Sequence, residues 1–219
     1  MKYILFDLDG TLANTIGDIQ GAINHVLQLC YCPTITEEQC MEVVGNGLKN
    51  ALKGALILNH RAFEPDEMEI LHHELITYYS EHPSDKTKPY KGMTEFLLRL
   101  KEKGYVLGVL SNKSDILVKQ IIKDIFPDNL FSFIHGGCDT LPMKPDKGAL
   151  DPFLEVMKIE KDEVLYVGDS EVDFNFIKNT EVKGCIVTWG FRTKEKLVEI
   201  GASPLLDSIN QLEEFIYVS

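Results

Sequence analysis

The spacing of hydrophobic and polar positions divides the chain into three parts. Residues 3–6 form a short apolar run with the length and composition of a buried strand, and acidic residues follow it directly. From about residue 17 to residue 82, apolar positions recur every three or four residues, as they do on one face of a helix. From about residue 89 onwards, short apolar runs alternate with helical patterns. The chain is therefore predicted to contain a strand, then a helical segment, then a series of strand–helix units.

The helical segment is predicted to hold four helices. An apolar stripe over residues 19–30 marks the first, and Thr36 with Gln39 three residues later has the pattern of a capping box that opens the second. A further stripe over residues 48–56 marks the third, and Pro65 suits the first turn of the fourth. Nothing in this stretch has the alternation of a strand.

The strand–helix units predict a parallel sheet with helices on both faces. Strands are expected at residues 105–110, 131–135, 164–167 and 184–188. Helices are expected at residues 92–103, 114–124, 147–157, 171–179, 193–200 and 208–217.

The first strand belongs with these units, so the helical segment is predicted to be an insertion after it. We expect an α/β fold whose core is a doubly wound, Rossmann-like parallel sheet formed by residues 1–14 and 85–219. Residues 15–84 are expected to form an inserted helical cap domain.

Composition narrows the class of protein. The chain of 219 residues is 44% hydrophobic and 26% charged, which is typical of a globular protein with a full core. Its net charge of −12 argues against non-specific binding to nucleic acid or to an anionic membrane. No apolar stretch approaches the roughly 20 residues of a membrane span, and Asp7 and Asp9 interrupt the N-terminal apolar run. We therefore expect a cytoplasmic protein, with its five cysteines reduced.

Asp7 and Asp9 are the first candidate functional residues. Two carboxylates at the end of a buried strand are costly unless a cation or a hydrogen-bond network holds them. Ligands of open parallel sheets bind at the carboxyl ends of the strands. Other polar residues that follow predicted strands, or precede a predicted helix, should meet this pair at the same edge. They are Ser111, Asn112, Lys144, Asp169 and Asp173.

These residue types suit phosphoryl chemistry. Carboxylate oxygens of Asp7, Asp9 and Asp169 are the donors that Mg²⁺ prefers. One carboxylate can attack phosphorus, and a second can protonate the leaving oxygen and later deprotonate water. Hydrogen-bond donors on Ser111 and Asn112 and a positive charge on Lys144 would stabilise phosphoryl oxygens.

Four segments in this order resemble the four motifs of the haloacid dehalogenase superfamily. They are Asp7-x-Asp9-Gly10-Thr11-Leu12, Ser111-Asn112-Lys113, Lys144-Pro145 and Gly168-Asp169-Ser170-x-x-Asp173. The helical insertion after the first motif resembles the caps of the phosphoglycolate phosphatase and β-phosphoglucomutase branches. Three further segments are similar to the phosphoglycolate phosphatase branch: Gly45-Asn46-Gly47, Lys88-Pro89-Tyr90-x-Gly92 and Trp189-Gly190-Phe191-Arg192. Asn14-Thr15 departs from the Asp-Ser or Asp-Thr often found after the first motif, and it falls at the expected hinge into the cap.

The resemblance implies a role for each matching residue. Asp7 corresponds to the nucleophile that becomes an aspartyl-phosphate, Asp9 to the general acid and base, and Lys144 to the lysine that steadies nucleophile and phosphoryl group. The residues implied to bind the substrate phosphate are Ser111, Asn112 and Thr11. The residues implied to hold Mg²⁺ are Asp7, Asp9, Asp169 and Asp173, where Asp9 acts through its main-chain carbonyl and Asp173 is either a ligand or a support for the ligands.

The resemblance implies a Mg²⁺-dependent phosphatase for a small organic phosphate monoester, with phosphoglycolate as the first candidate. A β-phosphoglucomutase-like phosphomutase, or a pyrophosphatase or nucleotidase, would use the same site. A phospho-receiver signalling domain would use similar residue types but has no use for a cap. The carboxylate at Asp9 argues against the dehalogenase and phosphonatase branches, which lack one there. The expected partner is a small phosphorylated metabolite.

Overall fold

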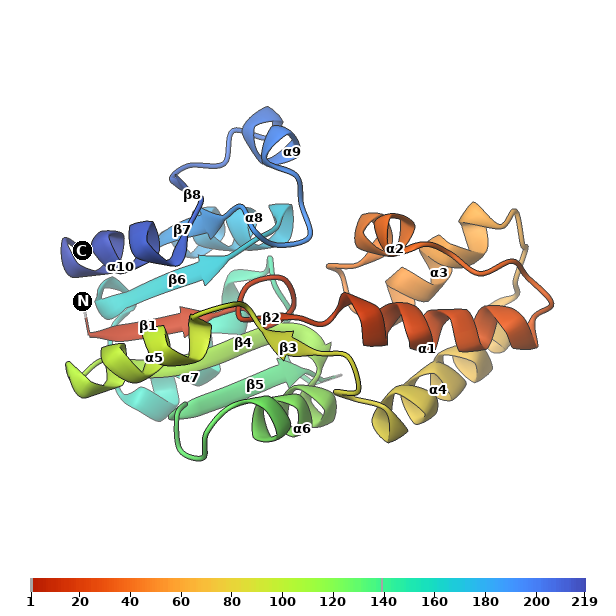
Figure 1. Cartoon of the computed structure of the whole chain (residues 1–219), viewed down its shortest axis with the longest axis horizontal. Helices are drawn as coiled ribbons and strands as arrows, with labels where there is room; N and C mark the ends of the chain where they lie inside the picture. Colours follow the sequence, from red (N-terminus) through yellow and green to blue (C-terminus); the bar gives the residue numbers. More distant parts are fainter. Residues whose placement is uncertain (1, 139) are drawn as a thin grey trace.

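A parallel β-sheet forms the centre of the molecule (Figure 1). The computed structural model describes residues 2–138 and 140–219, and within them the sheet has six strands in the order β5-β4-β1-β6-β7-β8. The strands are β1 (Tyr3–Phe6), β4 (Val106–Ser114), β5 (Phe133–Gly137), β6 (Val164–Gly168), β7 (Lys183–Val187) and β8 (Leu205–Leu206). The predicted doubly wound α/β fold is confirmed.

The central position of β1 brings three strand ends together. Residues 3–6 pair in register with residues 106–109 of β4 on one side and residues 164–167 of β6 on the other. Because all three strands run in the same direction, the residues that follow them emerge next to one another. Ile4, Leu5 and Phe6 are fully buried, which explains the unbroken apolar run in the sequence.

Helices cover both faces of the sheet. Ile4 and Phe6 of β1 belong to the core on the face covered by α5 (Met93–Glu102), α6 (Asp115–Ile125) and α10 (Ile209–Tyr217). Leu5 points to the opposite face, which is covered by α7 (Asp151–Met157) and α8 (Glu171–Thr180), with α9 (Lys194–Glu199) packed near β7.

One predicted helix is divided in two. The expected helix at residues 147–157 begins as a 3-10 turn, η1 (Lys147–Leu150), and continues as α7. Pro152 lies in the first turn of α7 and has no N–H to donate to the preceding turn, so the α-helix starts afresh there.

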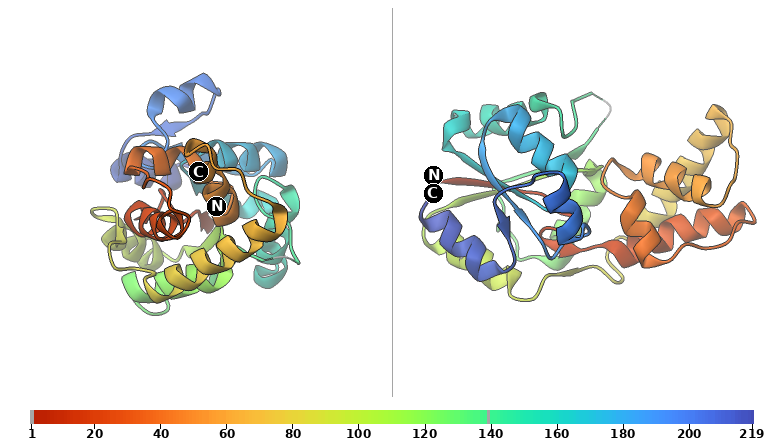
Figure 2. Two further views of the ribbon diagram at one scale, coloured as in Figure 1. Left: turned by 90° about the vertical axis from the view of Figure 1, so that its right-hand side faces the viewer. Right: turned by 90° about the horizontal axis from the view of Figure 1, so that it is seen from above.

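The four predicted helices of the inserted segment are confirmed. They are α1 (Ile16–Leu29), α2 (Glu37–Val43), α3 (Leu48–Leu58) and α4 (Pro65–Glu81). Figures 1 and 2 show them grouped beyond the carboxyl ends of the strands, with both chain termini at the opposite end of the sheet. The capping box is also as expected, since Thr36 accepts a hydrogen bond from the Gln39 N–H and the Gln39 side chain accepts one from the Thr36 N–H.

Two short crossings join the helical segment to the sheet. Strands β2 (Ala13–Asn14) and β3 (Lys88–Pro89) pair antiparallel, a contact too short to leave any pattern in the sequence. Asp18 in α1 is buried and accepts hydrogen bonds from the backbone N–H groups of Lys86 and Thr87 and from the Thr87 hydroxyl, at 2.7 to 3.0 Å. The outgoing and returning chains are therefore fastened to each other at the junction.

None of the helices in the described parts of the chain combines the length and apolar character needed to cross a membrane.

Candidate active site

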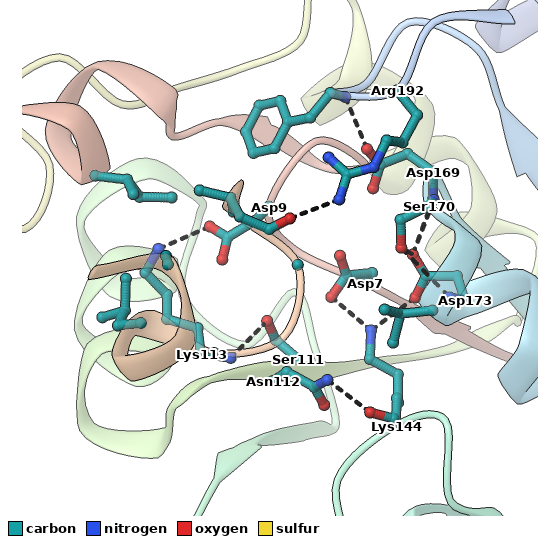
Figure 3. Close-up of a pocket in the computed structure, with 18 residues that line it drawn as sticks. Asp7, Asp9, Ser111, Asn112, Lys113, Lys144, Asp169, Ser170, Asp173 and Arg192 are labelled. Carbon is teal, nitrogen blue, oxygen red and sulfur yellow. Dashed lines mark hydrogen bonds and ion pairs between the residues drawn. The ribbon is translucent and has the colours of Figure 1, made fainter. Parts of the chain in front are cut away.

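A small, partly open cavity lies where the ends of β1, β4 and β6 meet the helical segment (Figure 3). Its volume is about 40 Å³, enough for a few water-sized groups. The core side of its wall includes these sequence-predicted residues: Asp7, Asp9, Ser111, Asn112, Lys144, Asp169 and Asp173. The helical side includes Val44, Gly45, Gly47, Leu48 and Ala51. A wider cleft of about 770 Å³ shares Gly47, Leu48 and Asn112 with the cavity and opens beside it.

Lys144 is fixed by three hydrogen bonds. Its Nζ donates to Asp7 Oδ1 at 2.8 Å, to Asp173 Oδ1 at 2.8 Å and to the Tyr166 hydroxyl at 2.7 Å. Burial acts to lower the pKa of Lys144, but the charges of Asp173 and Asp7 outweigh it and hold the pKa above its usual value. The ammonium therefore stays charged and has a single orientation, pointing at Asp7.

The negative charge of the carboxylates around Asp7 exceeds the positive charge that Lys144 supplies. Burial, and the nearby charges of Asp173 and Asp9, raise the pKa of Asp7 to about 7 against the lowering effect of Lys144. Burial and the charges of Asp173 and Asp7 likewise hold the pKa of Asp169 well above its usual range. These carboxylates would lose their proton readily if a further cation lay between them.

The carboxylates are arranged to hold such a cation. Asp7, Asp169 and Asp173 each offer an oxygen within 4.8 Å of the others, and all three are buried. Hard oxygen donors of this kind suit Mg²⁺, and the excess of negative charge fits a divalent ion.

Asp173 is the least available of the three as a ligand. Its Oδ1 accepts from Lys144 and Tyr166, and its Oδ2 accepts from the Ser170 hydroxyl at 2.6 Å and from the N–H groups of Ser170 and Asp169. Burial acts to raise the pKa of Asp173, but Lys144 and these hydrogen bonds hold it below its usual value. Asp173 is thus a permanent anion that orients Lys144 and the turn after β6.

Two glycines make room for Asp169. A Cβ atom on Gly10 would lie 2.3 Å from Asp169 Oδ2, and one on Gly190 would lie 2.2 Å from the same oxygen. Gly10 also has a φ of +87°, which side chains rarely allow. Asp169 in turn accepts hydrogen bonds from the Phe191 N–H at 2.8 Å and from the Thr11 hydroxyl at 3.1 Å.

Thr11 does not lie where the sequence-based expectation puts it. The resemblance implied that Thr11 binds the substrate phosphate, whereas the structure places its hydroxyl behind the cavity wall, on Asp169. The turn at Gly10 directs the chain beneath the cavity, so Thr11 supports an acidic residue of the cluster instead of facing the open space.

Ser111 and Asn112 both line the cavity but differ in what their side chains do. The Ser111 hydroxyl accepts a weak hydrogen bond from the Lys113 N–H at 3.3 Å, so its proton is free to be donated into the cavity. The Asn112 amide donates to the carbonyl of Lys144 at 2.7 Å and thereby braces the loop that carries Lys144.

Asp9 lies at the border of the cavity and the helical segment. Its Oδ1 accepts from the Thr15 hydroxyl at 2.6 Å and from Lys113 Nζ at 2.8 Å, and its side chain is 14% exposed. Asp9 is therefore held by Thr15, which lies between β2 and α1, and by Lys113 at the end of β4.

Comparison with known proteins decides the family. The sequence model of haloacid dehalogenase-like hydrolases matches residues 4–187. The chain belongs to the haloacid dehalogenase-like hydrolase family. It is 31% identical to a phosphoglycolate phosphatase of Haemophilus influenzae, covering 96% of both chains, and 29% identical to one of Vibrio cholerae, covering 100% of this chain and 98% of the relative. A crystal structure assigned to the phosphoglycolate phosphatases, from Lactobacillus delbrueckii subsp. bulgaricus, superposes with a TM-score of 0.91 at 27% identity and 98% coverage of each chain.

These similarities confirm the branch and the enzyme class expected from the sequence. The chain is a hydrolase of the phosphoglycolate phosphatase-like branch, and its class is phosphoric monoester hydrolase.

Tyr166 and Lys113 belong to the site but were given no role from the sequence, and Arg192, described below, is a third such residue. Tyr166 is a fully buried tyrosine in an otherwise aliphatic strand, and its hydroxyl joins Lys144 to Asp173. Lys113 stands within a recognised motif, yet only the fold shows its contact with Asp9. For Tyr166 the sequence signal was a hydroxyl within a strand expected to be buried. Lys113 lies outside the strand predicted at residues 105–110 and gave no such signal.

Arg192 links the core to the helical segment. Its Nε and Nη2 donate to the Glu171 carboxylate at 2.7 and 2.9 Å, and its terminal nitrogens donate to the carbonyl oxygens of Met41 and Val44 at the end of α2. The segment Trp189-Gly190-Phe191-Arg192 was recognised by resemblance, but this contact was not predicted, because main-chain carbonyl acceptors leave no trace in a sequence.

Proposed function

We propose that this enzyme hydrolyses a small organic phosphate monoester through a phosphoryl-aspartate at Asp7, with Mg²⁺ as cofactor and phosphoglycolate as the first candidate substrate. One observation carries the proposal: Asp7 lies in a small cavity with Lys144 Nζ fixed 2.8 Å from its Oδ1. A buried carboxylate held in this way can attack phosphorus while a fixed positive charge balances the phosphoryl oxygens.

In the first step, a carboxylate oxygen of Asp7 forms a bond to phosphorus as the bond from phosphorus to the ester oxygen breaks. Asp9 gives its proton to that departing oxygen, so the alcohol leaves neutral. The Ser111 hydroxyl, free to donate into the cavity, stabilises the charge on the phosphoryl oxygens together with Lys144.

In the second step, a water molecule attacks phosphorus and the bond to Asp7 breaks. Asp9 takes a proton from the water, which restores both carboxyl groups to their starting states. The sum of the two steps is one ester and one water converted to one alcohol and one phosphate.

For the metal, we assign Asp7 and Asp169 as side-chain ligands, with the main-chain carbonyl of Asp9 as the resemblance implies. Asp173 takes the supporting role, because both of its oxygens accept hydrogen bonds from the protein. Mg²⁺, when bound, offsets the charge of the phosphoryl group and of the crowded carboxylates.

For the domains, we propose that residues 15–84 act as a cap that closes over a core made of residues 1–14 and 85–219. The closed arrangement supports this, since Val44, Gly47 and Leu48 of the helical segment complete the wall of the cavity. Closure would exclude water from the phosphoryl group until the second step.

The helical wall of the cavity favours an anionic leaving group. A volume of about 40 Å³ leaves room for little beyond a phosphoryl group, so a leaving group larger than glycolate would extend into the wider cleft of about 770 Å³ beside Gly47 and Leu48. The N-terminus of α3 lies at the cavity, and its N-cap residue, Gly47, has no side chain that could accept a hydrogen bond from the first N–H groups of the helix. Free N–H groups at a helix N-terminus attract a carboxylate, as the glycolate leaving group would provide.

A substrate panel tests this proposal. The purified enzyme, stripped of metal and then supplied with Mg²⁺, is assayed on phosphoglycolate, ethyl phosphate, AMP, pyrophosphate and β-glucose 1-phosphate. We expect Mg²⁺-dependent phosphate release that is fastest with phosphoglycolate. Conversion of β-glucose 1-phosphate to the 6-phosphate would instead identify a phosphomutase, and folded enzyme that acts on none of the esters would contradict the proposal.

A further inference from the structure

Lys113 is a buried cation that the proposed mechanism has not yet used. Its side chain is 1% exposed, and it lines the cavity together with Ser111 and Asn112. Its Nζ donates to Asp9 Oδ1 at 2.8 Å and lies 4.6 Å from the centre of the Tyr79 ring. A buried ammonium is costly without partners of this kind, and the face of an aromatic ring is one of them.

The contact with Lys113 leaves one oxygen of Asp9 available. Lys113 and Thr15 both donate to Oδ1, and no donor within residues 2–138 and 140–219 makes a hydrogen bond to Oδ2. Two donors on one oxygen fix the rotation of the carboxyl group. The proton that Asp9 carries in the proposed mechanism would therefore reside on Oδ2.

Tyr79 brings the helical segment into this arrangement. It lies in α4, is fully buried, and has the one buried side-chain oxygen or nitrogen without a hydrogen-bond partner in the described parts of the chain. Leaving a buried hydroxyl unpaired is unfavourable, so the position of Tyr79 is explained better by its ring than by its hydroxyl. The ring can face Lys113 only while α4 is packed against the end of β4.

From these contacts we infer that Lys113 is a positioning residue for proton transfer by Asp9. It holds Asp9 with Oδ2 directed to the reaction, and Tyr79 makes that orientation depend on the packing of the helical segment. The inference rests on the proposed function, because it takes Asp9 as the group that protonates the leaving oxygen.

Esters with different leaving groups can show whether Lys113 positions Asp9 for proton transfer or only stabilises the fold. An alkoxide such as that of glycolate leaves poorly unless a proton reaches it as the bond from phosphorus breaks. A p-nitrophenolate anion leaves without a proton. Misplacing Asp9 should therefore slow the first step with alkyl esters far more than with p-nitrophenyl phosphate.

The test compares kcat/KM, which reports the first step, for wild type and Lys113→Met with Mg²⁺ on phosphoglycolate, phenyl phosphate and p-nitrophenyl phosphate. For Lys113→Met we expect a loss of about 100-fold with phosphoglycolate and of less than about 5-fold with p-nitrophenyl phosphate. A plot of log(kcat/KM) against leaving-group pKa should become steeper. The matched control is Lys161→Met, since Lys161 forms an exposed ion pair with Glu181.

Tyr79→Leu provides a second variant, which decides the matter if Lys113→Met does not fold. It removes the ring that faces Lys113 and should give the same selective loss, at smaller size. An equal loss on all three esters in the folded variants would overturn the inference while leaving the proposed function intact. Wild-type enzyme inactive on every ester would instead refute the proposed function and the inference with it.

Discussion

The guanidinium of Arg192 donates a hydrogen bond of 2.6 Å to the carbonyl oxygen of Val44, which lies 148 residues away in the chain. Arg192 belongs to the loop after β7, and Val44 ends α2 in the helical segment. The same guanidinium is held from the other side by Glu171, next to the acidic cluster. The link therefore joins the helical segment directly to the part of the core that would bind metal.

Loss of this link should weaken substrate binding more than chemistry. In Arg192→Met the apolar stem remains, but the hydrogen bonds to Glu171 and Val44 are lost. Hydrogen bonds to charged groups contribute about 1.5 kcal/mol or more, so we expect KM for phosphoglycolate to rise about tenfold while kcat changes by less than about threefold. Hydrogen exchange of the α2 amides should also become faster.

The control for this prediction is Arg99→Met, because Arg99 pairs with Glu213 in an exposed site on the core. Unchanged KM and unchanged exchange in Arg192→Met would show that Arg192 does not hold the helical segment.

Asp18→Ala should destabilise the whole chain. The buried carboxylate of Asp18 is the shared acceptor for Lys86 and Thr87 on the returning crossing, and its removal leaves their N–H groups without a partner. Such a loss costs about 3 kcal/mol. Urea unfolding checks it, with the exposed Asp128→Ala as control. A change below about 0.5 kcal/mol would mean that the crossings are held by other contacts.

Much of this fold and site could be predicted from the sequence because the decisive signals are local. The apolar run before Asp7 identified the central strand, and strand–helix alternation placed Ser111 and Asp169 at the same edge. The contacts that were missed join distant segments. Tyr79 reads as an apolar position of a helix, and nothing in its neighbours indicates that its ring faces Lys113.

Short elements escaped prediction for a different reason. The pair β2–β3 and the strand β8 are two residues long, so neither can show an alternation of apolar and polar positions. Thr11 was assigned to the substrate because it stands in the first motif, but only the path of the turn at Gly10 shows that its hydroxyl meets Asp169.

The crowded carboxylates should give the metal-free enzyme an unusual dependence on pH. The pKa of Asp7 in the folded chain, about 7, exceeds its ordinary value of 3.8, so between these values the folded state keeps a proton that the unfolded chain loses. The stabilising contribution is complete below about pH 4 and declines as pH rises towards 7. Asp169 shifts in the same direction.

The free energy of unfolding in the presence of a chelator should therefore fall by about 2 kcal/mol from pH 5 to pH 7, given 1.36 kcal/mol per pKa unit. Mg²⁺ should restore stability most strongly at pH 7, where the carboxylates are ready to bind it. Urea unfolding at the two pH values, with Asp7→Asn as a variant expected to show a flatter profile, checks this. A metal-free stability that rises over this range would contradict the assignment.

The central claim is that Asp7 becomes phosphorylated during turnover. The most direct measurement is a rapid acid quench of the enzyme mixed with phosphoglycolate and Mg²⁺, followed by mass spectrometry of the peptide that contains residues 3–12. The account predicts one phosphoryl group on Asp7 in the wild type, none in Asp7→Asn, and a loss of turnover by several orders of magnitude in that variant. Steady turnover with an unmodified Asp7, or wild-type rates in Asp7→Asn, would contradict it.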